Sequence, residues 1–152
     1  MFNIATESFL FDLYYGGKSA SESLEDGDET PESDVVVPVD ETTPVFRKIY
    51  VKNLTSRNAR RAMFFNGLPE MNINDIHIEN VTISAQYGAD MVESQNITFK
   101  NVKIVPQEGA ALILKNVQNM KADNFSYPEN LKDPVKISGD KTKGIQLPSI
   151  SK

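Results

Sequence analysis

Four short segments between Val45 and Gly139 repeat one pattern, in which apolar residues alternate with polar ones and an asparagine precedes a further apolar residue. The segments are Lys48–Leu54, Asp75–Val81, Asn96–Val102 and Asn119–Phe125. Repeats of twenty-odd residues are typical of solenoids. The two-residue apolar period indicates strands, and no helical period accompanies it. The sequence therefore predicts an all-β fold, a parallel β-helix of about four turns.

An asparagine stands near the end of each segment, at Asn53, Asn80, Asn101 and Asn124. Asparagine tolerates the left-handed backbone conformation of a sharp bend, and its amide can bond the next asparagine in a stack. We therefore expect a structural ladder of buried amides at one bend of the coil. Eleven residues after each asparagine, a second column of apolar side chains is expected to stack at the same offset: Phe64, Met91, Leu112 and Val135.

The alternation also predicts which side chains point into the coil and which point out. The inward set is Ile49, Val51, Leu54, Ile76, Ile78, Val81, Ile97, Phe99 and Val102. Each stacks on its counterpart in the next turn, about 4.8 Å along the coil axis. The only histidine, His77, alternates with this set and is expected to point outward, as a surface residue that is solvated or bonded to a neighbour. Corners between strands are predicted at Ser56–Arg61, Gln86–Asp90, Pro106–Ala110 and Tyr127–Pro134.

The chain is long enough for one domain, which we assign to residues 1–152. Its parts are a partial first turn (1–17), an acidic inserted loop (18–44), the repeat turns (45–139) and a C-terminal cap or tail (140–152).

The apolar run that ends at Gly16-Gly17 resembles the segment Arg61 to Gly67 at an offset near 53. The chain is therefore expected to enter a turn halfway through, so that the coil is truncated at its N-terminal end. An open coil end exposes unpaired strand edges and an apolar layer, which predicts self-association there into a homo-oligomer. At the other end, a cap must cover the last apolar layer, and the expected cap residues are Ile145, Leu147 and Ile150.

The acidic loop determines the net charge of −5, because nine acidic residues and no Lys or Arg lie between Ser19 and Glu41. The rest of the chain is mildly basic. Its basic residues are scattered rather than clustered with aromatic ones, which argues against a nucleic-acid partner. No apolar run approaches transmembrane length, and no signal peptide is visible. The sequence thus predicts neither nucleic-acid nor membrane binding.

The sequence gives no sign of cofactor or metal chemistry, because cysteine is absent and no metal-ligand spacing occurs. Adjacent carboxylates occur only in the acidic loop, and a flexible loop cannot hold them to catalytic tolerance. The remaining candidate carboxylates are Asp12, Asp75, Asp90 and Glu93. They fall in different turns, so no catalytic pair is predicted. Arginines cluster at one corner, at Arg57, Arg60 and Arg61. We interpret this corner as a solvated loop, with a carboxylate-binding site as the alternative.

Three stretches carry a resemblance to a known family: Phe11 to Gly17, Phe65 to Glu70, and Ile73 to Val81. Together they resemble the C-terminal part of bacterial glycoside hydrolase family 28, the polygalacturonases and their exo-acting relatives. The resemblance implies a right-handed, pectin-lyase-like parallel β-helix. It also implies secretion or a periplasmic location, and inverting hydrolysis of α-1,4-linked galacturonic acid in pectin without a metal or cofactor.

The catalytic motifs of that family are missing here: Asn-Thr-Asp, Asp-Asp, Gly-His-Gly and Arg-Ile-Lys. The resemblance therefore implies the C-terminal part of a pectin-degrading hydrolase that is inactive alone. The substrate-contacting tyrosine of the family matches Tyr15, with Tyr14 as the alternative and Asp12 and Lys18 beside it. A tyrosine that caps a strand edge is the structural alternative.

The expected partner is a galacturonan or pectin oligosaccharide. Two other functions remain open. One is a non-catalytic β-helix that binds carbohydrate or serves a structural role. The other is a calcium-dependent pectate lyase, which would need clustered, ordered carboxylates.

Overall fold

The computed structural model describes residues 1–13 and 45–147, and these form strands and connections without a helix. The strands are β1 (Glu7–Asp12), β2 (Arg47–Asn66), β3 (Ile73–Ser126), β4 (Val135–Ser138) and β5 (Lys143–Gln146). All strand pairs are parallel, in the order β1-β2-β3-β4 with β5 on β3. The predicted acidic loop at 18–44 lies outside the described residues.

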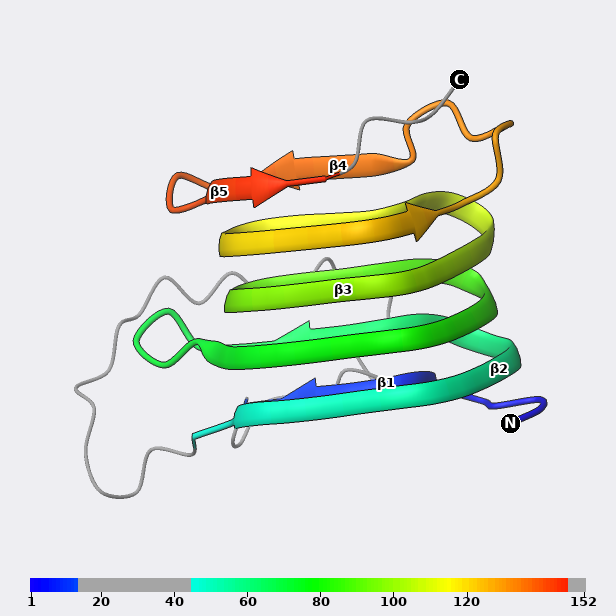
Figure 1. The fold of residues 1–152 in the computed structure, drawn as a ribbon, viewed down its shortest axis with the longest axis horizontal. Helices are drawn as coiled ribbons and strands as arrows, with labels where there is room; N and C mark the ends of the chain where they lie inside the picture. Colours follow the sequence, from blue (N-terminus) through cyan, green and yellow to red (C-terminus); the bar gives the residue numbers. More distant parts are fainter. Residues whose placement is uncertain (14–44, 148–152) are drawn as a thin grey trace.

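The strands β2 and β3 are far longer than ordinary strands because they bend around a common axis. Figure 1 shows the chain crossing the front from left to right, returning behind from right to left, and rising with each turn. This is a right-handed coil, and with about four turns it confirms the predicted parallel β-helix.

The predicted asparagine ladder is present at one bend. Each amide nitrogen donates to the side-chain oxygen of the asparagine one turn earlier, over 3.1 Å from Asn80 to Asn53, 3.0 Å from Asn101 to Asn80, and 2.9 Å from Asn124 to Asn101. All four residues have φ between 52° and 56°. The expectation that the ladder is buried is wrong, because all four asparagines are exposed. Their amides stack along the outside of the bend while the backbone turns inward.

A second file of left-handed residues marks the other end of the same strand segments. It consists of Lys48, Asp75, Asn96 and Asn119, with φ between 54° and 58°. Asn96 donates to Asn74 over 2.8 Å, and Asn119 donates to Asn96 over 3.2 Å. This file is not apparent from the sequence, because a lysine and an aspartate occupy two of its positions. Each front strand is therefore bounded by a bend on both sides.

The predicted inward residues form the core. The six from β3 are almost completely buried, namely Ile76, Ile78, Val81, Ile97, Phe99 and Val102. The three from β2 are half-buried against this core, because β2 supplies the first full layer: Ile49, Val51 and Leu54.

The predicted second apolar column, Phe64, Met91, Leu112 and Val135, is wrong at two of its three steps. A β-bulge between Ser56 and Ala59 shifts the register by one residue, so that Phe65, not Phe64, pairs with Met91. Later, the step between turns grows from 21 residues at Asn80–Asn101 to 23 at Glu93–Asn116. The 21-residue offset that linked Met91 to Leu112 therefore no longer holds there. The end of the column is correct, since Leu112 pairs with Val135.

Three of the four predicted corners coincide with irregularities. The bulge lies in Ser56–Arg61, a left-handed Gly109 (φ 74°) in Pro106–Ala110, and the β3–β4 connection in Tyr127–Pro134. At Gln86–Asp90 the strand continues without a left-handed residue.

The N-terminal segment is a partial turn, as predicted. β1 pairs with the second half of β2 in a register that joins Phe9 to Met63 and Phe11 to Phe65. Large hydrophobic side chains are exposed in this first layer and its connections: Met1, Phe2, Leu10, Val45, Phe46 and Tyr50. At the opposite end, Ile145 and Leu147 pack against the core as predicted, and Ile150 lies outside the described residues.

Candidate functional site

Of the four residues that the resemblance implied for substrate, the structure describes one. Asp12 is half-buried at the end of β1 and accepts a hydrogen bond of 3.1 Å from Asn66, its neighbour in the register. Tyr14, Tyr15 and Lys18 lie outside the described residues. These residues therefore remain predictions.

His77 points outward, as expected, and of the two predicted states it adopts the one bonded to its neighbours. Its ring stacks on that of Tyr50 one turn earlier, with centroids 4.7 Å apart and planes at 9°. Its Nε2 lies 2.6 Å from a carboxylate oxygen of Asp75. Tyr50 is 61% exposed, so this aromatic column presents a ring to solvent. The sequence held a signal, because the two rings occupy equivalent places in consecutive repeats.

Two lysines flank this column through a shared carboxylate. Glu79 lies 3.0 Å from the ammonium of Lys52 and 3.1 Å from that of Lys100, on the strands before and after it. The hydrogen bond from Lys52, followed by that from Lys100, lowers the pKa of Glu79. Both lysine side chains remain more than half exposed. Their charge is therefore accessible to a ligand on the surface.

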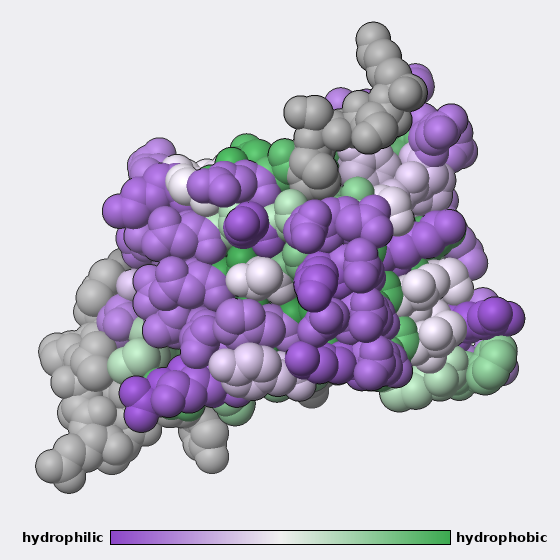
Figure 2. Space-filling view, viewed as in Figure 1, coloured by the Kyte–Doolittle hydropathy of each residue, from purple (hydrophilic) through white to green (hydrophobic). Residues whose placement is uncertain are grey.

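We call this surface the stacked-ring face; it comprises segments 47–53, 74–80, 95–101 and 118–124. The segments run along the front of the coil in Figure 1, and Figure 2 shows that hydrophilic residues cover most of that side. Together they carry five basic and three acidic residues. The face is flat, mildly basic and bounded by the two bends.

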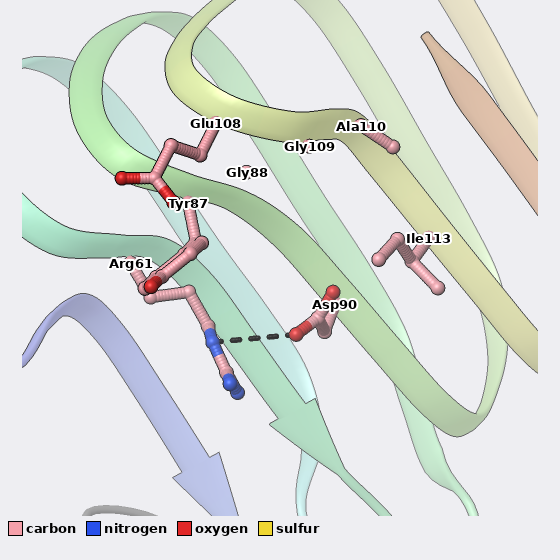
Figure 3. A pocket seen from close by; sticks show the side chains of 8 residues that line it. All are labelled: Arg61, Tyr87, Gly88, Asp90, Glu108, Gly109, Ala110 and Ile113. Carbon is pink, nitrogen blue, oxygen red and sulfur yellow. Dashed lines mark ion pairs between the residues drawn. The ribbon is translucent and has the colours of Figure 1, made fainter. Parts of the chain in front are cut away.

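A pocket of about 150 Å³ lies on the return strands, which run behind the stacked-ring face. Figure 3 shows the side chains that line it, and they come from β2 and two successive turns of β3. The lining residues are Arg61, Tyr87, Gly88, Asp90, Glu108, Gly109, Ala110 and Ile113. A side chain at position 88 would collide with the carbonyl oxygen of Ala110, so Gly88 allows the two turns to approach closely.

The pocket centres on an ion pair between Arg61 and Asp90, in which Nε lies 3.3 Å from Oδ2 (Figure 3). The Arg61 guanidinium also covers the ring of Phe64 at 4.5 Å from its centroid. Burial raises the pKa of Asp90, while the charge of Arg61 opposes this and the charge of Glu7 adds to it. Arg61 is only 7% exposed, so its assignment to a solvated corner is wrong; Arg57, in the same corner, is exposed.

The side-chain amide of Gln86 links two residues that line the pocket. Gln86 donates 3.2 Å to the carboxylate of Glu108 and 3.3 Å to the hydroxyl of Tyr87. Asp90 and Glu108 thus line one pocket, although the sequence analysis paired neither with another residue. Both residues belong to β3 on successive turns, and the corner around the left-handed Gly109 that brings Glu108 to the pocket is not predicted by strand periodicity.

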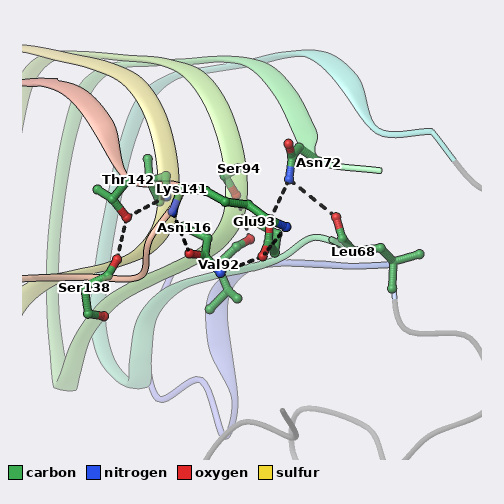
Figure 4. Close-up of polar contacts among 10 residues, drawn as sticks. Leu68, Asn72, Val92, Glu93, Ser94, Asn116, Ser138, Lys141 and Thr142 are labelled. Carbon is green, nitrogen blue, oxygen red and sulfur yellow. Dashed lines mark hydrogen bonds and ion pairs between the residues drawn. The ribbon is translucent and has the colours of Figure 1, made fainter. Parts of the chain in front are cut away.

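A third polar cluster surrounds Glu93, which is almost fully buried with φ 43°. Its carboxylate accepts hydrogen bonds of 3.0 Å from Asn72 and 2.7 Å from Asn116, and Lys141 lies 3.4 Å away (Figure 4). These partners come from the β2–β3 connection, the next turn and the C-terminal region. Three donors from different segments surround the Glu93 carboxylate, so this cluster joins three parts of the fold.

Within residues 1–13 and 45–147, no group of three or more metal-ligating side chains gathers. No helix in that part of the chain is long and apolar enough to cross a membrane. Comparison with family models, with curated proteins and with solved structures finds no match. The function must therefore be argued from the two surfaces themselves.

Proposed function

We propose that this chain is a β-helix part of a polygalacturonase-like, pectin-degrading protein, and that alone it binds galacturonan without hydrolysing it. The observation that carries the proposal is the Tyr50–His77 stack beside the ammonium groups of Lys52 and Lys100. An aromatic ring offers an apolar surface to the carbon–hydrogen face of a sugar. The lysines offer positive charge to the carboxylate that every galacturonate residue carries.

The shape of the stacked-ring face suits an extended chain rather than a small molecule. Successive strands lie about 4.8 Å apart, and each contributes outward side chains at equivalent positions. The excess of basic over acidic residues on this face favours a polyanion, because partly exposed charges attract it over about 10 Å. The preference is for an anionic sugar polymer over a neutral one.

Hydrolysis on this face is not expected, because an inverting mechanism needs one protonated and one free carboxyl group across the scissile bond. Both strand carboxylates beside the stack are engaged, Asp75 with His77 and Glu79 with two lysines. The lysines lower the pKa of Glu79, so it stays ionised at neutral pH and cannot serve as the general acid.

The test is calorimetric titration of the full chain with oligogalacturonate. Tyr50→Ala should weaken binding about tenfold, which corresponds to about 1.4 kcal/mol. The matched control is Phe2→Ala, which removes another exposed aromatic ring, one that lies against Arg57 rather than in the Tyr50–His77 stack. Replacing Lys52 and Lys100 together by Ala should lower both the affinity and its salt dependence, whereas Lys132→Ala, in the loop after β3, should change neither.

Absence of oligogalacturonate binding, or equal loss in the Tyr50 and Phe2 variants, would refute the proposal and favour a purely structural β-helix. A parallel incubation with polygalacturonic acid measures new reducing ends. Turnover above a protein-free blank would refute the non-hydrolytic part of the proposal.

A further inference from the structure

The pocket behind the stacked-ring face is lined by an arginine with a buried nitrogen that has no hydrogen-bond partner, and a carboxylate with the same deficit lies beside that arginine. Arg61 is more than nine-tenths buried and lines the pocket, yet its Nε has no hydrogen-bond partner among the described contacts; its 3.3 Å contact with Asp90 is an ion pair only. Both carboxylate oxygens of the adjacent Glu7 are buried and also lack such a partner. Buried polar groups without partners are rare in folded proteins. A ligand in the pocket that accepts hydrogen bonds would complement the Arg61 guanidinium.

The charge of this region excludes an anion. Asp90 and Glu108 line the pocket with one arginine, and Glu7 adds a third carboxylate close enough to raise the pKa of Asp90. A galacturonate carboxylate would meet like charge at short range, which disfavours binding. The ligand of the pocket therefore differs from that of the stacked-ring face.

The remaining chemistry of the lining fits a polyhydroxylated ring. The carboxylates of Asp90 and Glu108 accept hydrogen bonds, and Arg61 and the Tyr87 hydroxyl can donate them. Ile113 and Ala110 supply an apolar wall. A volume of about 150 Å³ lies well below the range of 300–1,000 Å³ that is usual for drug-sized ligands. The pocket therefore has room for one small ring.

We propose that the Arg61–Asp90 pocket binds a single neutral sugar residue, either a free monosaccharide or a neutral branch of a polysaccharide. The carboxylates would accept from adjacent hydroxyl groups, and Arg61 would donate to a hydroxyl or ring oxygen. This site is independent of the Tyr50–His77 stack, because the two occupy different faces of the coil. A protein with both would hold an anionic chain on one side and a neutral sugar on the other.

The experiment titrates the full chain with methyl galactoside, galacturonate and methyl galactosaminide, followed by protein-observed NMR. Methyl galactoside should shift the amide signals of Gly88, Gly109 and Ala110. Asp90→Asn, which keeps the shape but removes the charge, should weaken this binding about tenfold. Asp133→Asn, the same change in an exposed connection, should leave it intact. Galacturonate should produce no shifts at the three pocket amides.

If Asp90→Asn does not fold, Glu108→Gln provides the second test, since Glu108 lies on the exposed corner, and it should also weaken methyl galactoside binding. A neutral oligosaccharide with the same terminal residue distinguishes a branch from a free monosaccharide. The proposal fails if methyl galactoside causes no shifts up to its solubility limit. It also fails if the protonated methyl galactosaminide binds more than about tenfold tighter than methyl galactoside with strong salt dependence, because that result would identify a cation site. Failure of oligogalacturonate binding would leave this result unaffected, because the variants and ligands differ.

Discussion

Replacing Asn101 in the middle of the ladder should measure what the bend contributes to stability. Its side chain donates to Asn80 over 3.0 Å and accepts from Asn124 over 2.9 Å, so Asn101→Ala removes two hydrogen bonds. A hydrogen bond contributes about 0.5–1.5 kcal/mol net. Because the ladder is exposed, the lower value applies, and the two bonds together contribute about 1 kcal/mol.

The backbone adds a second cost, since Asn101 has φ 52°. The left-handed conformation costs about 1–2 kcal/mol for a residue with a Cβ, and asparagine reduces this by local hydrogen bonding whereas alanine does not. We expect Asn101→Ala to lower the free energy of unfolding by about 2 kcal/mol. Asn101→Gly loses the same bonds without the steric cost, so it should be about 1 kcal/mol more stable than the alanine variant.

Urea unfolding followed by far-UV circular dichroism gives these differences from the transition midpoints at constant slope. Lys103→Ala, an exposed residue just after the bend, is the control and should stay within about 0.5 kcal/mol of the parent. If the glycine variant is no more stable than the alanine variant, the backbone argument is wrong. If both match the parent, the ladder does not stabilise the coil.

Three further predictions concern the core, the polar cluster and the pocket. Phe99→Ala empties a fully buried site beside Phe125 and should cost about 3–5 kcal/mol in urea unfolding, whereas a loss below about 1 kcal/mol would mean that this layer is loosely packed. Glu93→Ala leaves Asn116 and Lys141 without their carboxylate and should lower the melting temperature more than Glu129→Ala in the exposed connection; an equal effect would mean that the Glu93 cluster does not stabilise the fold. Because burial raises the pKa of Asp90 above 3.8, the folded state holds this proton more tightly than the unfolded one. Stability should therefore fall as pH rises from 3.8 through the raised pKa, and Asp90→Asn should remove that fall; identical pH profiles of the two proteins would contradict it.

The parts of the fold that could be predicted from the sequence rest on residue types with a strong local preference. Asparagine at Asn53 and its three successors indicated a left-handed bend because few other residues adopt that conformation readily. The inward residues were predictable because a strand alternates strictly and one face must be buried. The prediction that the asparagine ladder is buried was wrong, because the stacked amides bond one another and can do so while exposed to solvent.

The second bend and the pocket could not be predicted, for two different reasons. At the second bend, Lys48 adopts a left-handed conformation that tertiary stacking imposes against its intrinsic preference, whereas Asp75 tolerates this conformation. With lysine and aspartate at two of its four positions, the second bend shows no asparagine column in the sequence. In the pocket, Arg61 pairs in register with Tyr87 and reaches diagonally to Asp90, the register partner of Phe64, and such a diagonal contact depends on side-chain direction rather than on the apolar repeat. Periodicity carries no information on such contacts.

Of the two irregularities that break the predicted apolar column, the longer step between turns also shapes the pocket. Where the step between turns grows from 21 to 23 residues, the additional chain is accommodated at the corner that contains Glu108, the left-handed Gly109 and Ala110, all of which line the pocket. In a perfectly regular coil, each side chain packs on its copy and leaves no hollow. Regular columns such as Tyr50 and His77 thus give flat faces suited to extended polymers, and changes in turn length give pockets suited to single rings. Ligand pockets in a β-helix should accordingly be sought where the repeat length changes.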